Sequence, residues 1–323
     1  MHVLQLVTNE RAPFFRQQVD SLERLGVTCD VRSPAGARSS TNSRSLGAYL
    51  SMAAEALMDR AGRYDLIHAN YGLTAPAALL ARETPTVLSL WGSDLLGSTG
   101  PFSRFCARQV DEVIVMNREM ASRLERPTHV IPHGIDMDRF RPIARERSLA
   151  EVGWQDGRKH VLFPYSADRA IKDFPTAASV VGALRNRLDD PVQLHTLTGV
   201  DHDRMPYYYN AADAVLITSK REGSPNAVRE ALACNRPVVA TDVGDIREHL
   251  DGLPVSTVSR SQSELTRGLV TALTTERSPA GRPRVRKTSA EAMGERLVTV
   301  YDRALGGVSG TEPQRNAATA EVG

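Results

Sequence analysis

The sequence lacks several features that define common classes of protein. It has only three cysteines in 323 residues, Cys29, Cys106 and Cys234, and no C-x-x-C pair, which fits a reducing compartment with buried thiols. No stretch approaches the roughly 18 apolar residues of a membrane-spanning helix. Residues 1–7 have the pattern of a strand and not of a signal peptide. Together these features predict a soluble, cytoplasmic protein.

The chain also lacks a strong charge and the common catalytic signatures. The net charge of +2 gives no global attraction to nucleic acid, and no nucleic-acid partner is expected. The eight histidines are scattered without metal-ligand spacing, so no metal site is predicted. No Walker A, G-x-S-x-G or Cys–His signature is present, and no G-x-G-x-x-G follows the first strand, which excludes a plain dinucleotide site there.

What the sequence does contain is an alternation of short apolar runs with amphipathic segments. This pattern predicts an α/β fold with open, mostly parallel, doubly wound sheets. The expected helices include 14–25, 46–60, 174–188 and a last helix at 289–305. The expected strands are 3–7, 27–31, 66–69, 86–90, 112–116, 160–163, 192–197, 214–217 and 237–240.

The length of the chain suggests two domains. We expect a first domain at residues 1–145 and a second at 158–288, joined through the polar stretch 141–159. The tail at 306–323 is rich in Gly, Thr, Ala and charge, without periodicity, and is predicted to be disordered.

Glu222 and Glu230 form the most informative pair in the sequence. The apolar run 214–217 predicts a buried strand, and Ser224 and Pro225 then predict an N-cap followed by proline at the first helical position. Glu222 would lie on the loop, and Glu230 on the same helix face as Asn226. A helix N-terminus suits a phosphate, whereas carboxylates suit hydroxyl groups. A nucleotide sugar combines both, although acids around a helix start are also common without any function.

The segment from Glu222 to Glu230, with residues 231–244 after it, resembles the E-x7-E region of retaining GT-B glycosyltransferases of family 4. Other segments resemble the same family in the same order. They are residues 64–69, residues 130–136 with Phe140 and Pro142, and residues 168–174. The teichuronic-acid biosynthesis glycosyltransferases look nearest. The resemblance implies two Rossmann-like domains facing each other across a cleft, with the acceptor on the first and the donor on the second. It also implies that helix 289–305 crosses back onto the first domain, and that the stretch between Leu197 and Ala214 is trimmed.

The resemblance also implies roles for individual residues. Glu222 would contact hydroxyls of the transferred sugar and Glu230 the ribose of the nucleotide. The loop residues between them would bind the donor, partly through backbone N–H groups; they are Gly223, Ser224, Pro225 and Asn226. Arg169 and Lys172 would clamp the departing diphosphate. The alternative for these two cations is a surface pair balanced by Asp168 and Asp173.

On the first domain, the candidates for the cleft or acceptor pocket are Asn9, His68, Trp91, Gly92 and Asp94. Trp91 stands where many relatives carry a histidine, so a histidine role is not implied there. Asp94 either lines the acceptor side or caps the following helix. His68 either touches the cleft or is a hydrogen-bonded structural histidine.

The resemblance implies a retaining, metal-independent glycosyltransferase that needs no cofactor and moves a sugar from a nucleotide-diphosphate sugar to an acceptor hydroxyl. Asp136-Met137-Asp138 matches the metal-binding D-x-D of GT-A enzymes, but it stands in a predicted turn without other ligands, so we reject it. Two alternatives stay open: a nucleotide-sugar 2-epimerase and a non-catalytic nucleotide-sugar binding protein. The helix at 46–60, preceded by Arg38 and Arg44, either contacts a membrane surface or packs in the core.

Overall fold

The computed structural model describes residues 1–34, 47–49, 51–52, 54, 63–81, 83–276 and 278–306. Most of the expected helix at 46–60 and the tail from residue 307 lie outside the described residues. The chain divides into two compact units, Met1–Pro132 with Met293–Gly323, and His133–Ala292. This division falls before the polar stretch 141–159, because Ile135 and Phe140 already pack into the core of the second unit.

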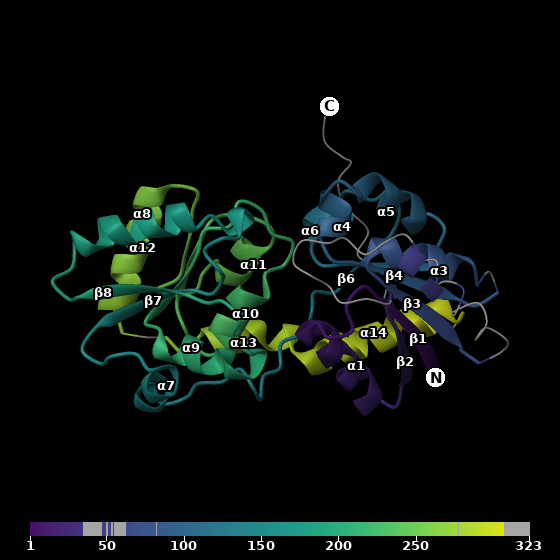
Figure 1. The fold of residues 1–323 in the computed structure, drawn as a ribbon, viewed down its shortest axis with the longest axis horizontal. Coiled ribbons are helices and arrows are strands. Elements are labelled where there is room, and N and C mark those ends of the chain that lie inside the picture. The colour runs from purple at the N-terminus through teal and green to yellow at the C-terminus, as the bar shows by residue number, and fades with distance from the viewer. Residues whose placement is uncertain are drawn as a thin grey trace. The chain divides into compact units, whose positions relative to one another are not determined.

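The first unit is built on a parallel sheet with the strand order β2-β1-β3-β4-β5-β6 in its described part (Figure 1). Because β1 pairs with both β2 and β3, the strand order reverses between β1 and β3. The strands are β1 (His2–Val7), β2 (Thr28–Arg32), β3 (Leu66–Asn70), β4 (Thr86–Leu90), β5 (Glu112–Val115) and β6 (His129–Val130). The helices are α1 (Pro13–Arg24), α3 (Ala75–Leu79), α4 (Ser93–Leu96), α5 (Gly100–Ala107), α6 (Arg118–Ala121), α14 (Ala290–Ala304) and the 3₁₀ helix η1 (Gly72–Thr74).

The two central strands of this sheet are buried along their whole length. Every residue of β3 and β4 is buried, as expected of parallel strands covered on both faces. Most of α14 belongs to this unit, and its Met293, Leu297 and Tyr301 pack into the same core. The chain therefore returns to the first unit through its last described helix.

The second unit also has a parallel sheet, with the order β11-β10-β9-β7-β8 in its described part. Here the order reverses between β7 and β9. The strands are β7 (Lys159–Phe163), β8 (Val192–Thr196), β9 (Ala214–Ile217), β10 (Val238–Ala240) and β11 (Thr257–Val258). The helices are α7 (Arg145–Val152), α8 (Phe174–Arg185), α9 (Met205–Ala211), α10 (Asn226–Ala233), α11 (Ile246–Leu250), α12 (Gln262–Thr274), α13 (Gly281–Val285) and the 3₁₀ helices η2 (Ala170–Lys172), η3 (His202–Arg204) and η4 (Arg286–Thr288).

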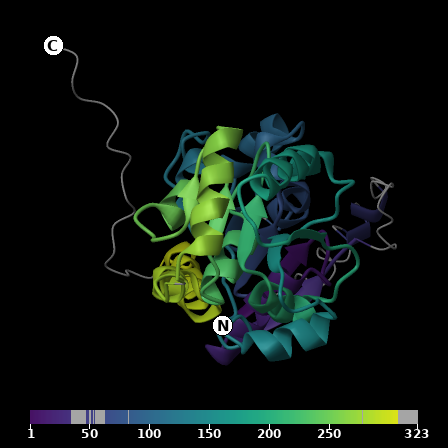
Figure 2. The ribbon, with the colours of Figure 1, turned by 90° about the vertical axis from the view of Figure 1, so that its left-hand side faces the viewer.

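Two groups of helices cover the two faces of this second sheet. On one face α8 and α12 lie side by side and pack on Val161, Phe163 and Leu216 (Figure 2). On the other face α9, α10, α11 and α13 pack on Leu162 and Ile217. Helix α9 was not predicted, because its sequence, MPYYYNA, combines proline, tyrosine and asparagine, which are poor helix formers. It occupies the stretch that was expected to be trimmed.

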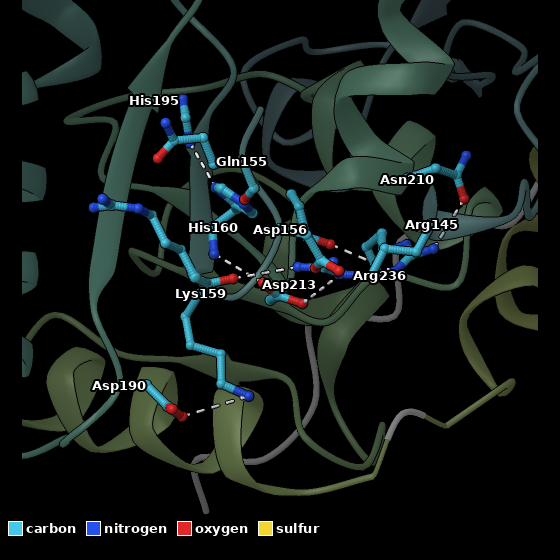
Figure 3. A network of polar contacts seen from close by, with 12 residues as sticks. Arg145, Gln155, Asp156, Lys159, His160, Asp190, His195, Asn210, Asp213 and Arg236 are labelled. Atoms are coloured by element: carbon cyan, nitrogen blue, oxygen red, sulfur yellow. Dashed lines mark hydrogen bonds and ion pairs between the residues drawn. The ribbon is translucent and has the colours of Figure 1, made fainter. Parts of the chain in front are cut away.

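A polar network closes the amino edge of the second sheet (Figure 3). His160 Nδ1 lies 2.9 Å from His195 Nε2, and Arg145 forms ion pairs with Asp156 and Asp213. An open hollow of about 440 Å³ lies at this edge, lined by these charged groups and residues of α12. Arg145 is paired there with Asp156 and Asp213, and Lys159 with Asp190, and ligands of open parallel sheets bind at the opposite, carboxyl edge. The functional site is therefore expected at the carboxyl edge.

Candidate functional site

The candidate site lies at the carboxyl ends of β7 and β9, where the strand order of the second sheet reverses. Two loops meet there, one after each strand. Thr218 Oγ1 donates to the carbonyl oxygens of Lys172 and Asp173, at 3.1 and 2.9 Å, and the Lys220 N–H donates to the Ile171 carbonyl at 2.9 Å. These bonds fix the two loops to each other, so the residues they carry are positioned together.

Lys172 and Glu222 form a buried ion pair between the two loops. The Lys172 ammonium bonds Glu222 Oε1, which also accepts from Ser219 Oγ at 2.6 Å. Only 6% of Lys172 is exposed. Burial lowers the pKa of Lys172, and the Glu222 charge acts against that shift. The structure brings these two residues together. The alternative of two surface cations balanced by Asp168 and Asp173 does not hold for Lys172, whereas Arg169 is exposed.

Tyr165 joins the second cation to this pair. The Lys172 Nζ lies 4.0 Å from the centre of the Tyr165 ring, and the Arg169 guanidinium carbon lies 5.7 Å from the same centre, so both cations lie over one aromatic ring. Burial, with Glu222 and Glu230 nearby, raises the pKa of Tyr165 well above its ordinary value. The Tyr165 hydroxyl is buried and has no hydrogen-bond partner in the part of the chain that the structure describes.

Glu230 lies on α10 and is held from two sides. Its Oε2 accepts from the Tyr209 hydroxyl at 2.8 Å, and its Oε1 lies 3.1 Å from His202 Nε2. Only 6% of Glu230 is exposed. Sequence reasoning missed both partners, because Tyr209 lies in the unpredicted helix α9 and His202 in the short helix η3 before it.

The start of α10 differs from the predicted cap. The helix begins at Asn226, and Pro225 takes the N-cap position without a side-chain cap. Ser224 does not cap the helix, because its hydroxyl donates to the Asp245 carboxylate at 2.6 Å. Asn226 Oδ1 accepts from the buried Arg229 guanidinium at 2.7 Å, so this oxygen has a structural partner.

The loop that carries Glu222 and Gly223 also packs closely against Gly244, on the loop after β10. Gly244 has a φ of +58°, and a Cβ on it would lie 2.4 Å from the Gly223 carbonyl oxygen and 2.9 Å from that of Glu222. Only glycine permits this approach. The backbone after β10 therefore supports the position of the Glu222 loop, a role that sequence reasoning did not assign.

In the first unit, two of the predicted residues have structural roles. His68 is fully buried, with Nδ1 2.7 Å from the Tyr301 hydroxyl and Nε2 2.7 Å from Ser89 Oγ. Burial lowers its pKa to about 3, so the ring is neutral and both nitrogens are engaged. Of the two alternatives for His68, a contact with the cleft or a hydrogen-bonded structural role, the structure matches the second.

Asp94 is also fully buried in the first unit. Its carboxylate accepts from the backbone N–H groups of Gly72, Trp91 and Gly92 at 3.0, 2.9 and 2.9 Å. Burial raises the pKa of Asp94. Asp94 lies inside α4 and bonds the loops around it, so the prediction that it caps the following helix is wrong. These bonds instead join the loops that follow β3 and β4.

The remaining predicted residues of the first unit shape its carboxyl edge. The Trp91 ring meets the Phe14 and Tyr71 rings edge to face, with centroids 5.0 and 5.9 Å apart. Asn9 Oδ1 accepts from the Arg11 N–H at 3.2 Å, within the turn after β1. Gly92 has a φ of +118° between β4 and α4. None of these contacts tests a role with an acceptor, which stays a prediction.

The structure gives Asp136 of the rejected D-x-D motif a turn role. Its Oδ1 accepts from the N–H groups of Asp138 and Arg139 at 3.0 and 2.9 Å. Across the described residues there is no group of three or more His, Cys, Asp or Glu side chains arranged to hold a metal ion. No helix in those same parts of the chain is long and apolar enough to cross a membrane.

Comparison with known proteins places both units. Residues 2–136 match the family model described as "Glycosyl transferase 4-like domain", and residues 166–275 match "Glycosyl transferases group 1". The chain is 27% identical over 244 residues to D-inositol 3-phosphate glycosyltransferase 2 of Catenulispora acidiphila, covering 58% of this chain and 57% of that protein. It is 29% identical over 214 residues to the teichuronic acid biosynthesis glycosyltransferase TuaC of Bacillus subtilis, covering 56% and 54%. The chain thus spans little more than half the length of these curated relatives.

Solved structures show the same architecture at low sequence identity. Sucrose-phosphate synthase from Thermosynechococcus elongatus matches with a TM-score of 0.75 and 16% identity, over 95% of this chain and 99% of that one. HepE of Anabaena in complex with UDP-glucose matches with a TM-score of 0.64 and 16% identity, over 95% and 98%. The predicted fold class, GT-B with two parallel-sheet α/β units, is confirmed.

Proposed function

This chain belongs to the group 1 glycosyl transferases of family 4, as its E-x7-E segment predicted, and on that premise we propose that it transfers a sugar from a nucleotide-diphosphate sugar to an acceptor hydroxyl. We further propose that the reaction retains the anomeric configuration and needs no metal ion. The observation that carries the proposal is the group at the carboxyl edge of the second sheet, where Lys172, paired with Glu222, and Arg169 lie beside Tyr165, with the Glu230 charge near the same ring.

Each group suits one part of such a donor. Glu230, with Tyr209 and His202 beside it, accepts hydrogen bonds from the ribose diol. Lys172 and Arg169, both beside the Tyr165 ring, stabilise the charge that grows on the departing diphosphate. Glu222 binds hydroxyls of the transferred sugar. Lys172 is paired with Glu222, so a bound diphosphate would compete for the same ammonium.

In this reaction the protein positions the donor and the acceptor and does not itself supply a nucleophile. The bond from the anomeric carbon to the diphosphate oxygen breaks, and the acceptor oxygen attacks from the same face while a phosphate oxygen takes its proton. The cations lower the barrier because they stabilise negative charge that is larger in the transition state than in the bound donor. The carboxylates contribute by holding both ends of the donor in place.

A thermal-shift screen of nucleoside diphosphates and their sugars tests donor binding, since a ligand that binds only the folded state raises the melting temperature. With the best ligand, Glu230→Ala should weaken binding about ten- to a hundred-fold, because a hydrogen bond to a charged group contributes roughly 1.5–3 kcal/mol. Unchanged affinity in calorimetry would refute the assignment of Glu230.

Product analysis separates transfer from the alternatives. The relatives' names suggest polyol phosphates and polysaccharide precursors as acceptors, so both belong in the assay. The transfer product should form only when an acceptor is present. Its NMR spectrum should show the same anomeric configuration as the donor, and a metal chelator should not lower the activity. A new sugar formed from the donor alone would indicate an epimerase, and binding without any turnover would indicate a binding protein.

A further inference from the structure

The carboxylate of Glu230 is held in a way that limits which ligand it can accept. A carboxylate offers about four lone-pair positions, two on each oxygen. Tyr209 occupies one on Oε2, and His202 occupies one on Oε1. One position is left on each oxygen. Two acceptor positions side by side match two neighbouring hydroxyl groups, which is the arrangement of the 2′ and 3′ hydroxyls of a ribose.

A second contact of His202 determines which of its ring nitrogens carries the proton. Arg139 Nη1 lies 3.2 Å from His202 Nδ1. A guanidinium can only donate, so Nδ1 must be the acceptor and the proton of the neutral ring lies on Nε2, facing Glu230. Arg139 is itself held by Asp203, with its Nη1 3.0 Å from Asp203 Oδ1. The His202 ring also packs edge to face on Phe140, with centroids 5.3 Å apart.

Tyr209 is the second hydrogen-bond donor to Glu230, and it lies in the core of the second unit. Its side chain is fully buried, and it packs against Phe140 with ring centroids 6.0 Å apart. Burial, with the Glu230 charge beside it, raises the pKa of Tyr209 well above its ordinary value. The hydroxyl therefore keeps its proton and donates it to Glu230 at any ordinary pH. The Tyr209 and His202 donors approach Glu230 from different elements, so the carboxylate plane has one orientation.

We propose that Tyr209 and His202 are positioning residues that orient Glu230 to read both ribose hydroxyls, and that the site therefore selects ribonucleotide donors over 2′-deoxyribonucleotide donors. This inference rests on the proposed function and deepens it, because it narrows the class of donor. A deoxyribose leaves one oxygen of Glu230 without its hydroxyl partner. Such an unpaired acceptor in a buried site is costly, which is the physical source of the selectivity.

The test measures a ratio of two affinities by calorimetry. The probes are the nucleoside diphosphate that gives the largest thermal shift and its 2′-deoxy counterpart. The unaltered protein should bind the ribo form about tenfold or more tightly than the deoxy form. Tyr209→Phe and His202→Phe each remove one donor and keep an aromatic ring. Each should weaken ribo binding by about three- to tenfold and change deoxy binding less, so the ratio shrinks.

Two further variants separate positioning from a loss of packing. His202→Gln keeps an N–H donor and an acceptor, so the ratio of the unaltered protein should be largely restored. Tyr208→Phe removes a hydroxyl from the neighbouring ring of α9, which packs on Trp154, and should leave the ratio unchanged. Equal binding of both probes by the unaltered protein, or an unchanged ratio in both Tyr209→Phe and His202→Phe, would overturn the inference and leave the donor assignment intact. If no nucleoside diphosphate binds the unaltered protein, both fall together.

Discussion

The two units place polar side chains at the same edge of similar sheets, but they use them differently. In the first unit His68 and Asp94 are fully buried, and each is surrounded by hydrogen-bond partners from its own unit. In the second unit Lys172, Glu222 and Glu230 stay slightly exposed and carry charge. Two parallel sheets of the same kind therefore hold one polar network that stabilises loops and another that we propose binds the donor.

This difference shows that a polar residue in or just after a strand is not enough to predict a site. What separates the two cases is how many hydrogen-bonding positions remain. Both ring nitrogens of His68 are engaged, whereas Glu230 keeps one lone-pair position on each oxygen. Variants that act on one unit and not on the other can test the contrast.

The largest effect is expected from Lys172→Met. This change removes the buried ammonium and keeps an apolar chain of similar length, so turnover should fall about a hundred- to a thousand-fold, as for other lost electrostatic stabilisers. Donor affinity should fall by about tenfold or less, because the charge on the diphosphate is greatest in the transition state. Steady-state kinetics and calorimetry measure the two effects.

The control for this prediction is Lys220→Met, which removes a lysine from the adjoining loop, after β9. Lys220 is exposed and lies 3.7 Å from Asp173, and exposed ion pairs contribute little. It should leave turnover within about twofold of the unaltered protein. Equal losses in both variants would mean that any positive charge on these two adjoining loops matters, and not the buried Lys172 charge in particular.

Gly244→Ala should have the next largest effect. The new Cβ would lie 2.4 Å from the Gly223 carbonyl oxygen, so the Glu222 loop must move. We expect donor binding to weaken by about tenfold and the free energy of unfolding to fall by about 2–4 kcal/mol from overpacking and backbone strain. Gly153→Ala is the matched control, since Gly153 also has a positive φ, +70°, but its Cβ would meet nothing within 4 Å. In that control the backbone strain alone should lower the free energy of unfolding by about 1 kcal/mol, and donor binding should stay normal.

The strands and the acidic pair could be predicted from sequence because their signals are local. Apolar runs bounded by turns mark β3, β4 and β9, and Glu222 and Glu230 lie on one continuous segment. The error at Ser224 has a different origin: its hydroxyl bonds Asp245, 21 residues away, and local cap rules do not include such a competitor. Tyr209 and His202 depend on how α9 packs beside α10, which no short pattern in the sequence encodes.

Asp94→Asn tests the first unit by the same logic. An amide has one acceptor oxygen, so at least one of the three N–H groups that Asp94 now bonds would face an NH₂ group. The loss of a buried acceptor should lower the free energy of unfolding by about 1–3 kcal/mol, measured by urea denaturation. Donor affinity should stay within about twofold of its original value. A large fall in donor affinity would contradict the assignment of Asp94 to a purely structural network.

His68 should give the smallest effect, visible only as a change with pH. Its pKa is lowered by burial to about 3, whereas in the unfolded chain it stays near the ordinary value of about 6.5. The unfolded state therefore takes up a proton first as the pH falls, and stability present above about pH 6.5 is lost progressively toward pH 3. Between pH 7 and 5.5 this histidine should account for a fall of about 1 kcal/mol in the free energy of unfolding.

Because burial also lowers the pKa of His133 in the second unit to about 3, the informative quantity is the difference between His68→Gln and the unaltered protein. His68→Gln should be less stable at pH 7 but lose about 1 kcal/mol less on acidification in urea titrations at the two pH values. An identical loss in both proteins would show that the His68 ring is not kept neutral by its burial.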